Sequence, residues 1–235
     1  MVRNLAIIPA RSGSKRVKDK NIRTLCGHPL LHWIVKSALE SELFEYVYVS
    51  TDSEKYAEIA RSSGASVPFL RDEFSDDKSD IANVVRRELF RIENFTGVKY
   101  DNVAVLQPTC PLLSPVDIKA VYEKFLMSEL PFAMTCFPFC HCNPWWAFKK
   151  GNDGKAEYLF SSPRTSRSQD FEQLYCPTGA FAIVNVAEFK SDPTAVADNC
   201  MYVPVSWESG FDIDCEADFN LAETLLKARS TGCSR

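Results

Sequence analysis

Apolar and polar positions alternate along the first half of the chain in blocks that suit strands and helices in turn. Continuous apolar runs bounded by polar turns are typical of buried strands, and they predict strands at 5–10, 46–50 and 102–106. Apolar residues at three- and four-residue spacing predict amphipathic helices at 29–39, 54–63, 81–95 and 118–127. A shorter extended piece is expected at 67–70. This order predicts an α/β fold with a doubly wound, mostly parallel sheet.

The pattern loosens between residues 131 and 175, where we expect a small inserted hairpin. Residues 143–148 hold an apolar cluster with two tryptophans, and Gly151–Gly154 is a turn signal. Such a cluster is typical of an interface, here a dimer contact, although packing against the core would explain it as well. Further strands at 132–136, 181–184 and 201–205 and a closing helix at 217–228 complete one domain over residues 1–235.

Composition narrows the class of protein. With 235 residues, 46% hydrophobic and 25% charged, the chain suits one globular domain, and its net charge of −4 argues against a nucleic-acid partner. The chain has no apolar run long enough for a membrane, and Arg11 interrupts the first apolar segment too early for a signal peptide. Nine cysteines without a CxxC pair favour reduced thiols and a cytoplasmic location. Cys140-His141-Cys142 lacks the spaced pairs of a zinc site.

The first predicted strand runs directly into a basic loop that we interpret as a phosphate site. Ser12, Gly13 and Ser14 are small enough to let backbone amides approach an anion. The cationic residues that would add charge there are Arg11, Lys15 and Lys20, whereas Arg16 and Lys18 are expected to be solvated. The loop matches neither the GxxxxGK[ST] pattern nor the GxGxxG pattern.

Near the end of the chain, Asp212 and Asp214 stand two residues apart. In an extended segment both carboxylates point to one side, where they repel each other unless a cation lies between them. Magnesium is commonly held by one or two carboxylates together with substrate phosphates, so we predict a Mg²⁺ site here. Capping of the following helix by Asp214 is the alternative, and Glu216 and Asp218 are expected in that helix's first turn.

A third polar cluster lies in residues 161–170. Arg164 and Arg167 would suit a bidentate clamp on a substrate carboxylate, with Gln169 and Asp170 beside them. Solvated surface residues have the same spacing, so the pattern leaves both readings open.

Five segments together resemble one enzyme family. They are Ile8–Lys15 with Lys20-Asn21, Val49–Asp52, Gln107–Leu112, Ser166–Asp170 and Asp212–Asp214. In this order, and over nearly the whole chain, they are similar to the signatures of the acylneuraminate cytidylyltransferases, which make CMP-sialic acids.

The resemblance implies a Rossmann-like nucleotidyltransferase, generally a homodimer whose mid-chain insertion supplies the dimer contact. It implies that CTP is joined to the anomeric hydroxyl of a nine-carbon 2-keto-3-deoxy acidic sugar, with Mg²⁺, giving a CMP-sugar and pyrophosphate. Charge that builds on the α-phosphate and the leaving pyrophosphate would be stabilised by the basic loop and the metal.

The resemblance also assigns roles to individual positions. The nucleotide would contact Ala10, Arg11, Gly13, Ser14, Lys15, Lys20, Asn21, Arg71 and Ser79. The sugar would contact Gln107, Arg164, Arg167, Gln169 and Thr178. Asp212 and Asp214 would hold the metal, and with Arg11 and Lys15 they form the implied catalytic set.

Two departures from the family pattern bear on the sugar. Thr178 stands where members that act on sialic acid commonly have Asn, and Ser168 stands where many have a second Arg, a spelling closer to the pseudaminic-acid branch. The expected substrates are therefore N-acetylneuraminate, pseudaminate, legionaminate or a deaminated relative. Alternatives are a cytidylyltransferase for the eight-carbon sugar Kdo and a nucleotide-binding regulatory protein without catalysis. A dehydrogenase is disfavoured because its glycine fingerprint is absent.

Overall fold

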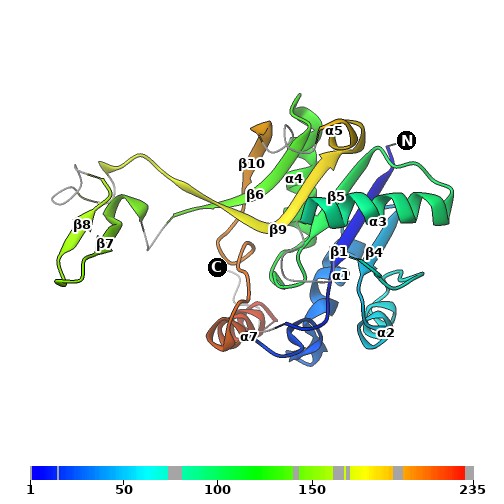
Figure 1. The fold of residues 1–235 in the computed structure, drawn as a ribbon, viewed down its shortest axis with the longest axis horizontal. Helices are drawn as coiled ribbons and strands as arrows, with labels where there is room; N and C mark the ends of the chain where they lie inside the picture. The colour runs from blue at the N-terminus through cyan, green and yellow to red at the C-terminus, as the bar shows by residue number, and fades with distance from the viewer. Residues whose placement is uncertain are drawn as a thin grey trace.

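A six-stranded sheet forms the centre of the computed structural model, which describes residues 2–14, 16–73, 81–139, 143–160, 167, 170–192 and 198–230 (Figure 1). The strand order across the sheet is β10-β6-β9-β5-β1-β4. The strands are β1 (Asn4–Pro9), β4 (Tyr46–Ser50), β5 (Asn102–Leu106), β6 (Phe132–Pro138), β9 (Tyr175–Asn185) and β10 (Cys200–Pro204).

Most neighbouring strands of this sheet run parallel. β1 pairs in parallel with both β4 and β5, so that Ile7 lies beside Tyr48 on one side and Val105 on the other. β10 pairs in parallel with β6, whereas β9 runs antiparallel to β5 and to β6. The predicted mostly parallel sheet is confirmed, and the carboxyl ends of β1, β4 and β5 share one edge.

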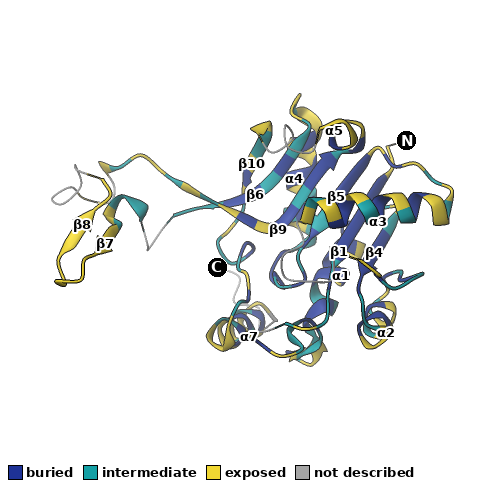
Figure 2. Cartoon of the chain, in the orientation of Figure 1, coloured by how far each residue is buried: buried dark blue, intermediate teal, exposed yellow. Residues whose placement is uncertain are grey.

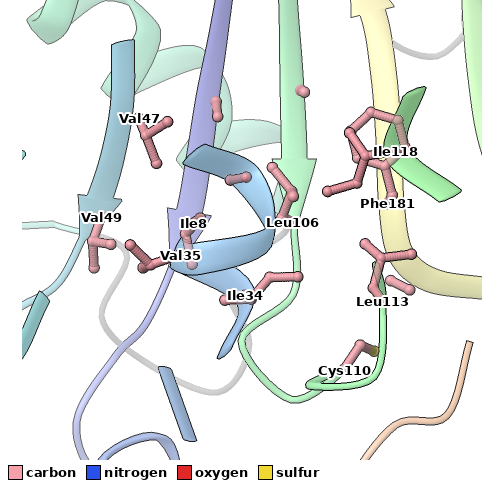
Figure 3. Packing of buried hydrophobic residues seen from close by; sticks show 14 of the residues in the cluster. Ile8, Ile34, Val35, Val47, Val49, Leu106, Cys110, Leu113, Ile118 and Phe181 are labelled. Atoms are coloured by element: carbon pink, nitrogen blue, oxygen red, sulfur yellow. The ribbon is translucent and has the colours of Figure 1, made fainter. Parts of the chain in front are cut away.

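Helices cover both faces of the sheet, as a doubly wound fold requires. The helices are α1 (Leu30–Glu40), α2 (Glu54–Ser62), α3 (Ile81–Thr96), α4 (Pro115–Met127), α5 (Val186–Ser191) and α7 (Glu216–Ser230). Alternate residues of β1 point to opposite faces: Ile8 joins the core formed with α1, α2 and α4, and Ile7 joins the core formed with α3 and α5. Figure 3 shows Ile34 and Val35 of α1 packed near Ile8.

Short elements link the first strand to α1. They are the 3₁₀ turn η1 (Lys20–Ile22), β2 (Thr24–Leu25) and β3 (His28–Pro29), and β2 and β3 form an antiparallel pair. Together with α7 they enclose a small separate core that contains Leu25, Leu30 and Phe219. This packing fixes the basic loop next to the segment that precedes α7.

Residues 67–70, where we expected a short extended piece, do not form a strand. Only Ser66 forms an isolated bridge, with Tyr48, and the chain bends at Pro68 and Phe69. Proline has no amide hydrogen to donate to a neighbouring strand, so the pairing ends there.

The predicted insertion forms an arm that extends away from the body (Figure 1). Its antiparallel strands β7 (Phe148–Lys150) and β8 (Ala156–Tyr158) flank the predicted turn and are exposed throughout (Figure 2), and the 3₁₀ turn η2 (Pro144–Trp146) precedes them. Trp145 lies between Phe160 and Phe171, with ring centroids 4.9 and 6.0 Å away. The arm is shorter than the predicted segment 131–175, because β6, near the start of that segment, belongs to the central sheet.

Candidate active site

A cavity of about 370 Å³ opens at the carboxyl ends of β1 and β5. This edge is where ligands of open α/β sheets bind. The cavity is lined by Pro9, Arg11, Ser14, Arg16, Val17, Lys20, Asn21, Gln107, Pro108, Thr109 and Asp214. We call it the basic cavity, because three of its side chains are cationic.

The basic loop is held in shape by contacts from neighbouring elements. Asp52, just after β4, accepts hydrogen bonds from the backbone nitrogen of Ser12 at 2.7 Å and from its hydroxyl at 2.9 Å. Gly13 has φ of +78°, which an L side chain rarely adopts. Asn21 donates from Nδ2 to the Arg11 carbonyl at 3.3 Å, and its buried Oδ1 has no hydrogen-bond partner within the described part of the chain. A ligand that donates a hydrogen bond there would satisfy it.

Lys20 joins this loop to the segment Asp212–Asp214. Its Nζ donates to the carbonyl of Ile213 and lies 3.6 Å from Oδ1 of Asp214. Arg16 was expected to be solvated; its side chain is exposed, yet Nη1 lies 2.8 Å from Oδ2 of Asp214. The backbone nitrogen of Ile213 donates to the Thr109 carbonyl at 2.9 Å, so both walls of the basic cavity are tied together.

The two carboxylates of the acidic pair take different positions. Residues 211–214 form no strand, and Asp214 lines the basic cavity whereas Asp212 lines a second one. Asp218 accepts hydrogen bonds from the backbone nitrogens of Asp214 and Cys215, so Asp218 caps the start of α7 in place of Asp214. The predicted positions of Glu216 and Asp218 in the first turn of α7 are confirmed.

The pKa of Asp212 is raised above the ordinary aspartate value. Loss of surrounding water is the main cause and repulsion from Asp214 adds to it, against the hydrogen bond from Thr109 and the attraction of Lys20. A cation near Asp212 would counter both of the effects that raise its pKa.

The second cavity, of about 470 Å³, adjoins the basic cavity. It is lined by Phe137, Pro138, Phe139, Pro177, Thr178, Gly179, Trp207, Gly210, Phe211 and Asp212. The two cavities meet where Gly179 faces Gln107: a Cβ on Gly179 would lie 3.4 Å from Cγ of Gln107. We call this second cavity the apolar cavity. Among its lining residues, the sequence had assigned only Thr178 to the sugar and Asp212 to the metal.

Arg71 lies outside both cavities and is buried. Its backbone nitrogen donates to the Thr51 carbonyl at 2.7 Å, and its Nε and Nη2 have no hydrogen-bond partner within the described ranges. Burial lowers the pKa of Arg71, although Asp52 and Glu88 favour its charged form. A buried guanidinium with open donors is suited to a polar ligand group that approaches from the loop side.

The remaining predicted residues are not gathered at the cavities. Ala10 is buried and donates from its backbone nitrogen to the Ser50 carbonyl at 2.9 Å. Arg167 follows β8 on the arm, is exposed, and pairs with Asp170 at 3.4 Å. Lys15, Ser79, Arg164 and Gln169, and the Cys140–Cys142 segment, lie outside the described residues.

Sequence reasoning did not assign a site role to Thr109 or Trp207. Thr109 was visible in the Gln107–Leu112 segment, directly after a strand, which is a signal that could have identified it. Trp207 lies in a turn between β10 and α7 and carries no local pattern, so only the packing shows that it lines the apolar cavity.

Comparison with known proteins identifies this arrangement. A family profile described as Cytidylyltransferase matches residues 5–175, which include the basic loop, the Gln107–Thr109 turn and the arm. The chain belongs to the cytidylyltransferase family. As a member of it, the protein is a nucleotidyltransferase, in agreement with the resemblance found in the sequence.

Similar proteins match this cytidylyltransferase along its length. It is 37% identical to a pseudaminic acid cytidylyltransferase of Campylobacter jejuni, over 96% of this chain and 97% of that protein. It is 34% identical to a CMP-N,N'-diacetyllegionaminic acid synthase of Legionella pneumophila, with the same coverage. An N-acylneuraminate cytidylyltransferase of Escherichia coli is 30% identical over 96% of this chain, which spans 52% of that longer protein.

A solved structure shares the fold. The structure of CMP:2-keto-3-deoxy-manno-octonic acid synthetase complexed with CTP superposes with a TM-score of 0.68 at 18% identity, covering 97% of this chain and 99% of that one. Within the described residues, the cytidylyltransferase has no helix that combines the length and the apolar character needed to cross a membrane.

Proposed function

We propose that the protein joins CTP to the anomeric hydroxyl of a nine-carbon 2-keto-3-deoxy acidic sugar and releases a CMP-sugar and pyrophosphate. The observation that carries the proposal is the basic cavity, in which Arg11, Lys20 and Arg16 face one opening at the carboxyl edge of the sheet, with Asp214 on its wall. The names of the relatives in Campylobacter, Legionella and Escherichia support a nonulosonic acid as the sugar.

In this proposal the basic loop holds the triphosphate. Arg11 and Lys15 place positive charge where negative charge builds on the α-phosphate and on the leaving pyrophosphate, and the Gly13 and Ser14 backbone approaches the phosphates closely. Lys20, which lines the same cavity, would contact the triphosphate as well. The rest of the nucleotide would contact Ala10, Asn21, Arg71 and Ser79, of which Asn21 and Arg71 have open hydrogen-bonding atoms.

We place the magnesium site at Asp212 and Asp214. No group of three or more His, Cys, Asp or Glu residues in the described ranges is arranged to hold a metal without help. Because Asp214 lines the basic cavity and Asp212 the apolar cavity, a shared Mg²⁺ would lie where the two cavities meet. This ion commonly takes its remaining ligands from substrate phosphates and water. When bound, the ion would supply charge stabilisation at the phosphates. Asp214 would then exchange its contact with Arg16 for the ion.

The sugar would lie between the two cavities. Gln107, at the end of β5, lines the basic cavity and Thr178, on β9, lines the apolar cavity, which supports a sugar that spans both with its anomeric hydroxyl directed toward the phosphates. Arg164 and Gln169 complete the proposed contacts by resemblance.

We further propose a homodimer formed through the arm. Its exposed side chains include Trp146, Phe148 and Leu159, which is a large apolar surface for a structure that extends into solvent. Arg167 lines neither the basic nor the apolar cavity of its own chain, and in a dimer it would serve the cavity of the partner. A cytoplasmic location is supported by the six described cysteines, all of which are free thiols.

Pyrophosphate release tests the proposal. The protein is incubated with CTP and Mg²⁺ and a panel that contains N-acetylneuraminate, pseudaminate, legionaminate and Kdo. Release with one or more nine-carbon sugars is expected. Pyrophosphate release with Kdo alone would identify a cytidylyltransferase for Kdo. CTP binding without pyrophosphate release on any of the sugars would favour a non-catalytic nucleotide-binding protein.

Sedimentation tests the dimer separately. Sedimentation velocity of the wild type is expected to show a dimer, and replacing Trp146 and Phe148 by Ser is expected to yield monomers. A wild type that sediments as a monomer at micromolar concentration would contradict the proposed assembly.

A further inference from the structure

Asp52 lies between two parts of the candidate site that are far apart in the sequence. It directly follows β4 and the buried Thr51, and it is itself partly buried. It is not among the described residues that line the basic cavity or the apolar cavity, so it would act on a nucleotide through its neighbours. These neighbours are the basic loop on one side and Arg71 on the other.

The first neighbour is Ser12 of the basic loop. Both carboxylate oxygens of Asp52 are used: Oδ1 accepts from the backbone nitrogen of Ser12 at 2.7 Å, and Oδ2 accepts from its hydroxyl at 2.9 Å. Hydrogen bonds to an ionised acceptor are stronger than those between neutral groups. Ser12 follows Arg11, which lines the basic cavity, and precedes Gly13 with its positive φ, so this two-point contact fixes the turn of the loop.

The second neighbour is Arg71. Its backbone nitrogen donates to the carbonyl of Thr51 at 2.7 Å, which places Arg71 beside the residue that precedes Asp52. Its side chain is buried, and its Nε and Nη2 have no hydrogen-bond partner among the residues that the structure describes. Burial works to lower the pKa of Arg71, and Asp52 provides the largest of the effects that oppose it, ahead of Glu88. Asp52 is therefore the main carboxylate that compensates this buried guanidinium.

Glu88, the other carboxylate near Arg71, is held by different partners. It is fully buried on α3, where it accepts from the Tyr48 hydroxyl and pairs with Nη1 of Arg91 at 3.1 Å. These contacts join α3 to β4. Of the two carboxylates, Asp52 is thus the one that is also bonded to the basic loop.

Resting on the proposed function, we propose that Asp52 is a positioning residue that couples the two halves of the nucleotide site. Its two bonds to Ser12 hold the basic loop for the triphosphate, and its charge holds the Arg71 guanidinium in place for the remainder of CTP. A triphosphate that orders the loop also fixes the carboxylate beside Arg71, so each part of CTP assists the binding of the other. Inorganic tripolyphosphate needs only the loop, whereas CTP needs both halves.

Asp52→Asn tests the charge while the shape of the side chain is retained. The amide oxygen can still accept from the Ser12 nitrogen, and the amide nitrogen can donate to the Ser12 hydroxyl. We expect the Kd for CTP with Mg²⁺, measured by titration calorimetry, to rise about tenfold, which is the lower end of what a charged hydrogen-bonding group contributes. The Kd for tripolyphosphate should change by less than about threefold, because the loop keeps its hydrogen bonds and loses a nearby negative charge.

Glu54→Gln is the matched control. It also removes one carboxylate, two residues from Asp52, but Glu54 is exposed and pairs with Arg61 at 2.6 Å on the surface of α2. Both Kd values of this control should equal those of the wild type. An Asp52→Asn variant that matches the control on CTP would overturn the inference. An equal loss on CTP and on tripolyphosphate would show that Asp52 serves the loop alone and would overturn the coupling.

A double-mutant cycle tests the same coupling without changing Asp52. Ser12→Ala removes one of the loop bonds and should weaken CTP and tripolyphosphate alike, whereas Arg71→Gln should weaken CTP only. Because the two residues share Asp52, the loss of CTP affinity in the double variant should differ from the product of the single losses by at least about twofold. Losses that simply multiply would overturn the coupling.

The wild type separates this inference from the proposed function. A wild type that neither binds CTP nor releases pyrophosphate would overturn the proposed function, and with it the role of Asp52. The outcomes given for the variants would overturn the role of Asp52 alone, because the wild type would still bind CTP and release pyrophosphate.

Discussion

Lys20 is expected to stabilise the fold by joining the basic loop to the segment before α7. Its side chain is only 13% exposed, and its ammonium group donates to the Ile213 carbonyl and lies near Asp214. We expect Lys20→Met to keep the packing of the aliphatic stem and to remove both of these interactions.

The size of the effect follows from the two contacts. A hydrogen bond from a charged donor contributes about 1.5–3 kcal/mol, and an ion pair with a half-exposed carboxylate adds less than about 1 kcal/mol. Removing the ammonium group from a mostly buried position recovers part of its desolvation cost. The net loss is therefore about 2 kcal/mol, which lowers Tm by about 4–8 °C in a chain of this length.

Urea unfolding and calorimetry measure this loss. Lys36→Met is the control, because Lys36 makes an exposed pair with Glu40 at 3.7 Å on α1 and should change stability by less than about 0.5 kcal/mol. Titration with CTP should also show weaker binding to Lys20→Met than to the control. The reasoning is refuted if the two variants unfold at the same urea concentration.

Three further predictions concern other parts of the molecule. Asp212→Asn should lower turnover far more than it raises the KM for CTP; unchanged turnover at saturating magnesium would remove Asp212 from the metal site. Burial works to raise the pKa of Glu93, but the hydrogen bonds from Lys99 and Lys190 outweigh it and lower that pKa. The stability that the ionised Glu93 provides should therefore be fully present above the unfolded-state pKa of about 4.5 and should be lost as the pH falls through the lower pKa of the folded state. The urea midpoints of the wild type and of Glu93→Gln should accordingly converge at acidic pH. Leu89→Ala, at a fully buried position of α3, should cost about 2–5 kcal/mol, and a smaller loss by calorimetry would show that the α3 face is loosely packed.

The sequence alone determined the elements whose pattern is local. The sequence predicted the bounds of β4, β5 and helix α3 to within a residue or two. Their apolar spacing indicates directly which face of each element is buried. The basic loop could also be predicted from the sequence, because a strand that ends in small and cationic residues leads to the binding edge of an α/β sheet. Its Gly13 adopts the positive φ that such a turn requires.

The tertiary structure decided which distant residues meet. The direction of β9 follows from its pairing with β5 and β6, and no local pattern encodes this. Asp212 and Asp214 face two different cavities because the Thr109 carbonyl and Lys20 hold the intervening Ile213, contacts that join segments about a hundred or more residues apart. The apolar cavity is assembled from three such segments, around Phe137, Thr178 and Trp207. Local sequence therefore specifies backbone conformation and burial, whereas the shape and polarity of a site depend on long-range packing that only the folded chain creates.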